Sequence, residues 1–138
     1  MQVFQQDFFE HTAERMPTAI AVEDGEFSIS YGELDKRANR IGNLLRELGC
    51  RPNDRVCIAT NKNIGAYAAV LGILKSGACW VPLSLSYPED RLSRLLKVLA
   101  PKAIVAEPAT LEAILAARKR ADSQAALDHV RQRSTQVN

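Results

Sequence analysis

The sequence predicts an α/β fold, with a short parallel-sheet unit, flanking helices and an N-terminal β-hairpin. Two observations predict this class. Between residues 50 and 106, short apolar runs alternate with longer segments of helical periodicity, which is the pattern of a parallel sheet covered by helices. Earlier in the chain, an Asp-Gly dipeptide stands between two brief apolar or alternating runs, which is typical of a β-hairpin.

The length and composition are those of one ordinary globular domain. The chain has 138 residues, 46% of them hydrophobic and 25% charged, which excludes a disordered, collagen-like or disulfide-scaffold protein. A chain of this size buries about two-thirds of the surface that it exposes when unfolded, enough for one core. The formal net charge of +2 is too balanced to hold a phosphate backbone by itself, so nucleic acid is not an expected partner.

The first expected elements are a helix and a hairpin. Apolar residues recur at helical spacing from Phe4 to Met16, and Pro17 ends the pattern. Two short strands are expected on either side of the Asp-Gly turn, at Ala19 to Val22 and at Phe27 to Ser30.

The strongest helical pattern in the chain runs from Tyr31 to Leu48. Its apolar positions follow a three-four rhythm over successive turns. Ser30 can cap its start, Glu33 stands three residues later, and Gly49 is placed as its C-terminal stop.

A strand, a helix and a second strand are expected next. Val56 to Ala59 is a continuous apolar run, typical of a strand covered on both faces. Asn63 can cap a helix that Gly77 ends, and Ala78 to Leu83 is expected to form the following strand. Because a crossover between parallel strands is right-handed in about 98% of cases, this helix should cover one face of the sheet.

A further helix and strand complete the predicted sheet unit. Pro88 occupies a first-turn position, and two acidic residues follow it near the positive end of the helix dipole. Pro101 ends this helix, and Ala103 to Ala106 is expected to form the third strand.

The composition changes after Pro108. Ala109 to Asp122 and Ser123 to Val130 are rich in alanine and charge, which predicts high helix propensity with a thin buried face. The last residues, Gln132 to Asn138, are expected to be frayed. We therefore divide the chain into residues 1–107 and an Ala-rich, charged helical tail, residues 108–138.

Lys75 and Ser76 stand where a phosphate-binding loop could end. In such a loop a glycine-rich turn wraps backbone amides around phosphate, but the required glycines would fall at Ala69 and Leu74. Lys75 also closes a helix rather than opening one. It is therefore interpreted as a cation that satisfies the C-terminal carbonyls of its own helix.

Other reactive residue types are interpreted as structural. Neither His11 nor His129 has a nucleophile or second ligand in a recognisable pattern. The serines lack the spacing of a nucleophile elbow and are explained by caps and turns: Ser30, Ser76, Ser84 and Ser86. We predict no catalytic, cofactor-binding or metal-binding residue in this chain.

The cysteines and the tryptophan are also expected to be structural. Cys50, Cys57 and Cys79 are odd in number and lack metal-ligand spacing, which favours buried free thiols in a reducing compartment. Trp80 is interpreted as a core residue, with an interface role as the alternative.

No export or membrane signal is expected. The first residues are too polar and charged for the apolar segment of a signal peptide. The most apolar stretch, Asn63 to Pro88, is interrupted by Lys75 and Pro82, whereas a membrane span needs about 20 unbroken apolar residues. A cytoplasmic location is predicted.

Three strings of residues resemble the opening motifs of a known enzyme family. They run from Ile29 to Leu34, which Ala38 to Arg40 soon follow, from Leu74 to Leu83 and from Tyr87 to Leu92. In order and spacing they are similar to the opening motifs of the acyl-adenylating, or AMP-binding, superfamily. The closest likeness is to adenylation domains of nonribosomal peptide synthetases. The resemblance covers roughly Phe4 to Ala106 and does not include the tail.

The sequence departs from the family pattern at three positions. Ser84 stands where the family has an aspartate after Pro-Leu, Ser86 where a proline is often found, and Trp80 where a tyrosine is usual. These departures affect local turn geometry and leave the resemblance intact.

The resemblance implies a fold and limits the chemistry. The chain would be the start of the large adenylation subdomain, with residues 1–107 as the N-terminal portion of an adenylation-type domain. A complete member uses ATP and Mg, and holds the phosphates on a Ser/Thr/Gly-rich loop ending in Pro-Lys-Gly. That string does not occur here. No cofactor is therefore expected for this chain alone, and independent enzymatic activity is not expected.

Three functional hypotheses follow. The first is an N-terminal piece of an adenylation domain, natural or engineered, without catalysis of its own. The second is an assembly or interaction module, as a homodimer or with another protein, because a sheet cut off part-way leaves an apolar edge or face. The third is one half of a split adenylating enzyme. The expected partners are a second copy or a complementary synthetase chain, and neither nucleic acid nor membrane.

Overall fold

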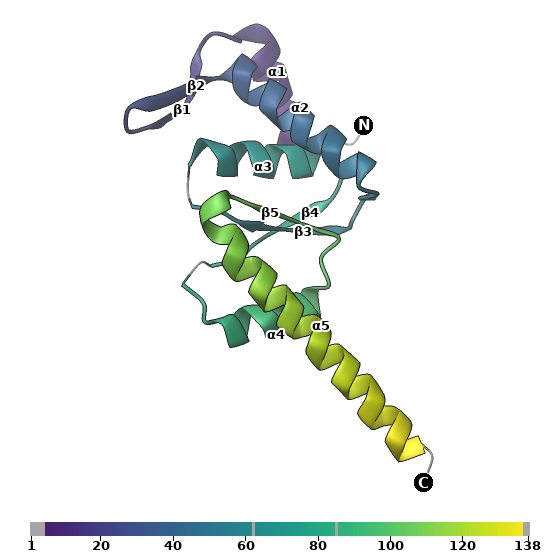
Figure 1. Cartoon of the computed structure of the whole chain (residues 1–138). Helices are drawn as coiled ribbons and strands as arrows, with labels where there is room; N and C mark the ends of the chain where they lie inside the picture. The colour runs from purple at the N-terminus through teal and green to yellow at the C-terminus, as the bar shows by residue number, and fades with distance from the viewer. Residues whose placement is uncertain (1–4, 62, 85, 137–138) are drawn as a thin grey trace.

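The computed structural model describes residues 5–61, 63–84 and 86–136 (Figure 1). Helices and strands alternate along most of the chain. Their order is α1 (Gln5–Arg15), β1 (Ile20–Asp24), β2 (Phe27–Ser30), α2 (Tyr31–Glu47), β3 (Arg55–Ala59), α3 (Ile64–Lys75), β4 (Cys79–Pro82), α4 (Glu89–Leu99), β5 (Ala103–Ala106) and α5 (Pro108–Gln136).

The strands form two separate sheets. β1 and β2 pair antiparallel as a hairpin, with Gly25 in its turn at a φ of 61°. β3, β4 and β5 form a parallel sheet in the spatial order β4-β3-β5. The predicted class, a short parallel-sheet unit with flanking helices and an N-terminal hairpin, is confirmed.

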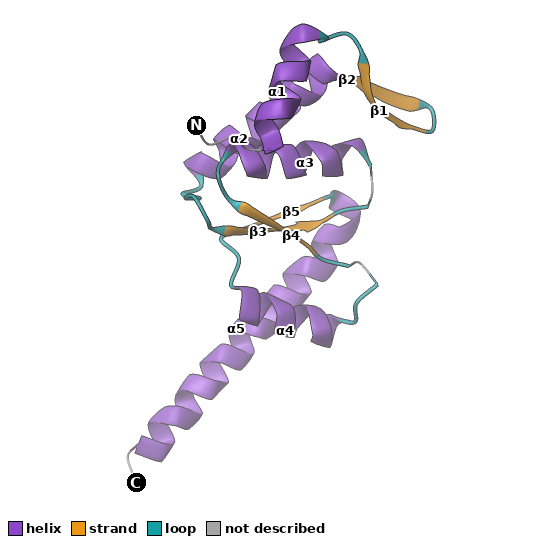
Figure 2. Ribbon diagram, turned by 180° about the vertical axis from the view of Figure 1, so that it is seen from behind, coloured by secondary structure: helices purple, strands orange, loops and turns teal. Residues whose placement is uncertain are grey.

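Helices cover both faces of the parallel sheet, as Figures 1 and 2 show: α3 lies over one face with α2 above it, and α4 and α5 lie on the other. The central strand β3 supplies residues to both layers in alternation. Val56 and Ile58 pack with α2 and α3, whereas Cys57 and Ala59 pack with α4 and α5. This explains why the β3 sequence is continuously apolar.

The predicted caps are in place at the two best-defined helix starts. The Ser30 side chain accepts a hydrogen bond from the Glu33 backbone N–H at 3.2 Å, and the Asn63 side chain accepts one from the Ala66 N–H at 3.0 Å. Gly49 and Gly77 follow the ends of α2 and α3 with φ values of 89° and 82°, which glycine adopts without steric cost.

The helices α2 and α3 approach each other closely at two glycines. A Cβ atom added at Gly72 would lie 2.7 Å from the Ile41 Cβ and 2.9 Å from the Ala38 carbonyl oxygen. One added at Gly42 would lie 3.1 Å from the Gly72 carbonyl oxygen. The spacing between the two helices therefore depends on the absence of side chains at this crossing.

Two predictions about helix ends are wrong. Pro88 is the N-cap of α4 rather than a residue of its first turn. The helix ends at Leu99, and its C-cap Ala100, with a left-handed φ of 43°, stands directly before Pro101. The tail forms one continuous helix, α5, and this helix includes residues 132–136, which were expected to be frayed. Alanine-rich sequence lacks an internal stop signal, so the helix continues. Residues 137–138, like Phe4, lie outside the described residues.

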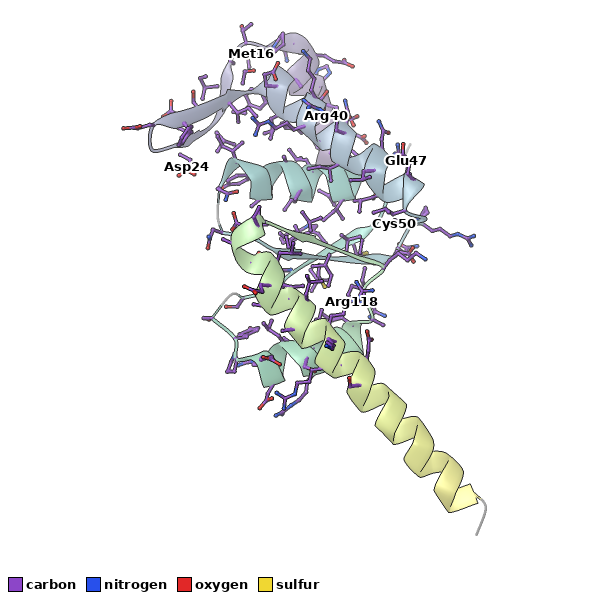
Figure 3. All side chains as sticks on the ribbon, in the orientation of Figure 1. Met16, Asp24, Arg40, Glu47, Cys50 and Arg118 are labelled. Atoms are coloured by element: carbon purple, nitrogen blue, oxygen red, sulfur yellow. The ribbon has the colours of Figure 1, made fainter. Side chains whose placement is uncertain are left out.

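The edge position of β4 corrects two burial predictions. Cys50, at the turn after α2 (Figure 3), and Cys57 are buried as expected, but Cys79 is exposed. Trp80 is 42% exposed and is not a core residue. Both lie on a strand with a neighbour on one side only, and the strand order could not be predicted from the local apolar pattern.

Candidate functional site

The carboxyl edge of the parallel sheet is the candidate functional site. In open α/β sheets, ligands bind outside the carboxyl ends of the strands, where connections leave toward opposite faces. Here the chain leaves β3 toward α3 on one face and leaves β5 toward α5 on the other. The point of divergence therefore lies between β3 and β5.

A polar cluster of four residues closes this point, and we call it the edge cluster: Asn61, Asn63, Glu107 and Thr110. The Glu107 carboxylate accepts hydrogen bonds from the Asn61 backbone N–H at 2.8 Å and from the Asn63 side-chain amide at 3.3 Å. The Thr110 hydroxyl donates to the Ala59 carbonyl oxygen at 2.6 Å. The polar groups of the cluster therefore tie the loop after β3 to the start of α5.

A hollow of about 700 Å³ opens beside β4, and we call it the β4 groove. Aromatic and aliphatic side chains make up most of its wall, and two serines and Asn61 provide polar atoms. Its lining includes Tyr67, Val70, Trp80, Leu83, Ser84, Ser86 and Tyr87. Among the described residues of the lining, none is basic, so the groove suits an apolar group rather than a phosphate.

The wall of the β4 groove is held by local contacts. The hydroxyl oxygens of Ser84 and Ser86 lie 2.8 Å apart, within hydrogen-bond distance. The Arg91 guanidinium lies over the Tyr87 ring, 4.1 Å from its centroid, a cation–π contact. These two serines are two of the three positions where the sequence departs from the family pattern, and here they stabilise a turn.

A second hollow, of about 480 Å³, lies beside β5, and we call it the β5 hollow. The end of β5 forms one wall, and the hairpin and α2 contribute Asp24, Phe27 and Arg37. Asp24 stands near the hairpin turn, as Figure 3 shows. Thr60 lies at both hollows, and its hydroxyl is buried without a hydrogen-bond partner in the described part of the chain.

Lys75 does not bond the C-terminal carbonyls of its own helix, as the sequence predicted, but pairs with two carboxylates. Its ammonium group lies 2.8 Å from Glu10 Oε1 on α1 and 2.7 Å from Asp35 Oδ1 on α2, and its side chain is only 8% exposed. The carbonyls at the end of α3 are instead bonded by Gln6 and Arg46. The prediction failed because both acidic partners are distant in sequence.

The surroundings of Lys75 favour its charged form. Burial lowers the pKa of the ammonium group, but hydrogen bonds and attraction from Asp35 and Glu10 outweigh burial, so the pKa is raised. A lysine acting as a base needs the opposite shift. The geometry therefore assigns Lys75 to joining three helices.

The buried thiols are protected from ionisation. Burial raises the pKa of the Cys57 thiol to about 11, against a smaller opposing effect of Arg55. Burial and Asp54 raise the pKa of Cys50, while Lys102 acts in the opposite direction. Since the thiolate is the nucleophile, neither thiol has the environment of a reactive cysteine.

The remaining residues considered from the sequence are dispersed. His11 is exposed on α1, and the side chain of His129 lies outside the described part of the structure. Ser30 caps α2, and the buried Ser76 hydroxyl donates to the Ile73 carbonyl oxygen at 2.6 Å. Among the side chains that the structure describes, no group of three or more His, Cys, Asp or Glu could hold a metal ion.

The sequence prediction missed the edge cluster and both hollows. Glu107 directly follows a predicted strand, and this position could have indicated a carboxyl-edge residue. Its partners lie on a different loop, however, and nothing in the local sequence connects them.

A comparison with protein families decides the relationship. The family model described as "AMP-binding enzyme" matches residues 9–137. The chain belongs to the AMP-binding enzyme family. The match includes α5, which the opening motifs do not reach, and the proposed boundary at residue 107 stays a prediction.

Curated relatives of the chain include large synthetases. The chain is 40% identical over 101 residues, 73% of its length, to the probable non-canonical nonribosomal peptide synthetase CymA of Salinispora arenicola (strain CNS-205). It is 42% identical over 89 residues, 64% of its length, to surfactin synthase subunit 1 of Bacillus subtilis (strain 168). The matches span 1% and 2% of those proteins. The resemblance to nonribosomal peptide synthetase adenylation domains is therefore confirmed for the part that they share.

Solved structures show the same relationship. The nonribosomal peptide synthetase FmoA3 matches with a TM-score of 0.77 and 36% identity, over 80% of this chain and 12% of that one. A benzoate CoA ligase from Burkholderia xenovorans LB400 matches with a TM-score of 0.79 over 85% of this chain and 24% of that one. At 24% identity, the second likeness concerns the fold alone.

One further finding concerns membranes. Within the described part of this AMP-binding family member, no helix is both long and apolar enough to cross a bilayer, α5 included.

Proposed function

We propose that this chain is the scaffold of the N-terminal part of an amino-acid-adenylating or acyl-adenylating domain of the nonribosomal peptide synthetase type, and that it has no catalysis of its own. ATP and Mg would be bound only when the chain is completed by the segments that carry the phosphate loop. A complementary synthetase chain is the proposed partner.

The observation that carries this proposal is where the family motifs lie. Leu34 is 2% exposed at the start of α2, and a Cβ added at Gly32 would lie 3.0 Å from the Pro17 carbonyl oxygen. Lys75 is enclosed by two carboxylates, and Gly77 has a φ of 82°. Leu92, from the third motif, is 4% exposed. Packing and backbone geometry account for each of these residues.

The chemistry of adenylation supports the same proposal. Phosphoryl transfer depends on positive or dipolar groups aimed at the phosphates and on a nucleophile held in line. The polar groups of the edge cluster are bonded to one another, and the β4 groove suits apolar groups. The described residues therefore offer a framework rather than a triphosphate site.

A cytoplasmic location is proposed together with this function. All three cysteines are free thiols, and Cys79 is exposed. Free thiols are typical of a reducing compartment.

Isothermal titration with ATP and an ATP–pyrophosphate exchange assay test the proposal. The chain alone should bind no ATP and support no exchange with a panel of amino and aryl acids. Adding the FmoA3 adenylation domain, expressed without the segment that matches this chain, should produce a complex. Exchange by the chain alone would contradict the proposal.

The β4 groove favours a second candidate, an assembly module. Tyr67 and Trp80 are 51% and 42% exposed there, and large apolar side chains at a groove are typical of interfaces. Sedimentation at increasing protein concentration tests this candidate. A single monomeric species up to high concentration would rule out self-association.

A further inference from the structure

We propose that the outer edge of β5, and not that of β4, is the docking site for a fourth parallel strand supplied by the rest of an adenylation domain. This inference rests on the proposed function and specifies where the missing part joins. Both outer edges are unpaired in the described structure, because β4 and β5 each bond only to β3.

The hydrogen-bond pattern shows which backbone groups face outward on β4. Cys79 and Leu83 donate their N–H groups to the Asp54 and Ile58 carbonyls on the β3 side. Backbone N–H and C=O groups of successive strand residues point alternately to the two sides of the strand. Those of Trp80 and Pro82 therefore point away from β3. Proline has no N–H to donate, so the outer edge of β4 lacks one of its donors, a device that limits pairing at sheet edges.

The outer edge of β5 has no such interruption. Lys102 donates its N–H to the Arg55 carbonyl on β3 at 2.8 Å, so Ala103 and Val105 face outward by the same alternation. Within the described residues, β5 pairs with no strand on this outer side, where both N–H groups point. The strand itself is uncharged, and its side chains are half-buried. The β5 edge can therefore accept a full set of strand hydrogen bonds.

The handedness of the connections points to the same edge. The chain passes from β4 across β3 to β5 through α4, which covers the second face of the sheet. α5 follows β5 and packs against α4 on that face (Figure 2). Right-handed crossovers on one face all advance in the same direction across a sheet. A parallel strand reached from β5 by way of α5 would therefore lie beside β5.

The surface beside β5 has room for such a strand. The β5 hollow of about 480 Å³ adjoins the carboxyl end of the strand, and Val105 and Ala106 form part of its wall. Phe27, on the hairpin at its rim, is 73% exposed. The occupant that fits is an extended segment with apolar residues facing the sheet layers, as a buried parallel strand has.

Amide hydrogen exchange measured by mass spectrometry tests the inference. The full chain is compared alone and with the FmoA3 adenylation domain that lacks the matching segment. In the complex, exchange in peptides covering residues 102–106 should slow at least tenfold, whereas residues 79–82 should change by less than twofold. The Ala103→Pro variant removes one outward N–H from β5 and should weaken binding at least tenfold.

A matched variant on the other edge is the control. Pro82→Ala adds an outward N–H to β4 and should leave binding within twofold. Circular dichroism shows whether each variant is folded, and if Ala103→Pro unfolds, the exchange measurement on the unaltered chain decides. Binding without slower exchange at β5, or with slower exchange at β4, would overturn this inference and leave the proposed function standing. Absence of binding would overturn both, and a homodimer protected at β5 would replace the stated occupant by a second copy.

Discussion

The helical layer of α1, α2 and α3 and the carboxyl edge of the sheet are built in opposite ways. In the helical layer, α2 and α3 meet at bare glycine backbone, and Lys75 is enclosed by acids from two other helices. At the sheet edge, two hollows open beside β4 and β5, which pair on one side only, and Trp80 is exposed. The first region is complete within this chain, whereas the second has surfaces suited to a partner. Substitutions should therefore be costly in the first region and tolerated in the second.

The largest expected effect comes from Gly72→Ala. The new Cβ would lie 2.7 Å from the Ile41 Cβ, which cannot move without shifting α2 against α3. We expect a loss of about 2–3 kcal/mol in the free energy of unfolding, measured by urea denaturation. Gly65→Ala on the same helix is the control, because its nearest neighbour is only the Asn63 side chain. Equal stability of the two variants would contradict the close crossing.

The next effect comes from Lys75→Met, which removes the cation from Glu10 and Asp35. Losing charged hydrogen bonds at a side chain that is 8% exposed should cost about 2 kcal/mol of unfolding free energy. Lys36→Met is the control, since the Lys36–Glu33 pair is mostly exposed and exposed pairs contribute little. If both variants melt at the same temperature, the ion pairs of Lys75 do not join the helices.

The contribution of Lys75 should also depend on pH in one direction. Its pKa in the folded protein is raised above the ordinary value of 10.5, so its stabilisation is fully present below pH 10.5. The stabilisation is lost as the pH rises through the folded-state pKa. The difference in melting temperature between the unaltered chain and Lys75→Met should therefore be constant from pH 7 to 9 and shrink above 10.5. A difference that changes between pH 7 and pH 9 would mean that another group is responsible.

The smallest effect is expected at Cys79 on the outer strand β4, where chemical labelling should not measurably change the stability of the chain. A maleimide reagent at pH 7.5 should label Cys79 on the folded chain, because Cys79 is exposed while Cys50 and Cys57 are buried. The raised pKa of Cys57, about 11, further suppresses its thiolate at this pH. Mass spectrometry should detect one label per folded chain, three after denaturation, and none on folded Cys79→Ser.

Local signals made much of the fold predictable. Ser30 and Asn63 cap helices through side chains three residues from their partners, and Gly77 ends a helix through its own backbone freedom. Each of these features lies within one turn of chain, so the sequence pattern contains it.

Long-range geometry explains what could not be predicted. Glu10 and Asp35 lie 65 and 40 residues from Lys75, so a local pattern could only suggest helix carbonyls as its partners. Trp80 was expected in the core because an apolar run does not reveal whether its strand is central or at an edge. For the same reason the edge cluster was missed: Asn61 and Glu107 are 46 residues apart and meet only once the sheet is assembled.

The length of α5 determines how far a strand that followed it in the same polypeptide would have to return to reach the sheet. A helix of 29 residues extends about 44 Å, whereas the four residues of β5 span about 13 Å. α5 therefore overshoots the sheet, as Figure 2 shows. A strand joined to its end would need a returning tether of about nine extended residues to reach β5, whereas a strand from a separate polypeptide would need none.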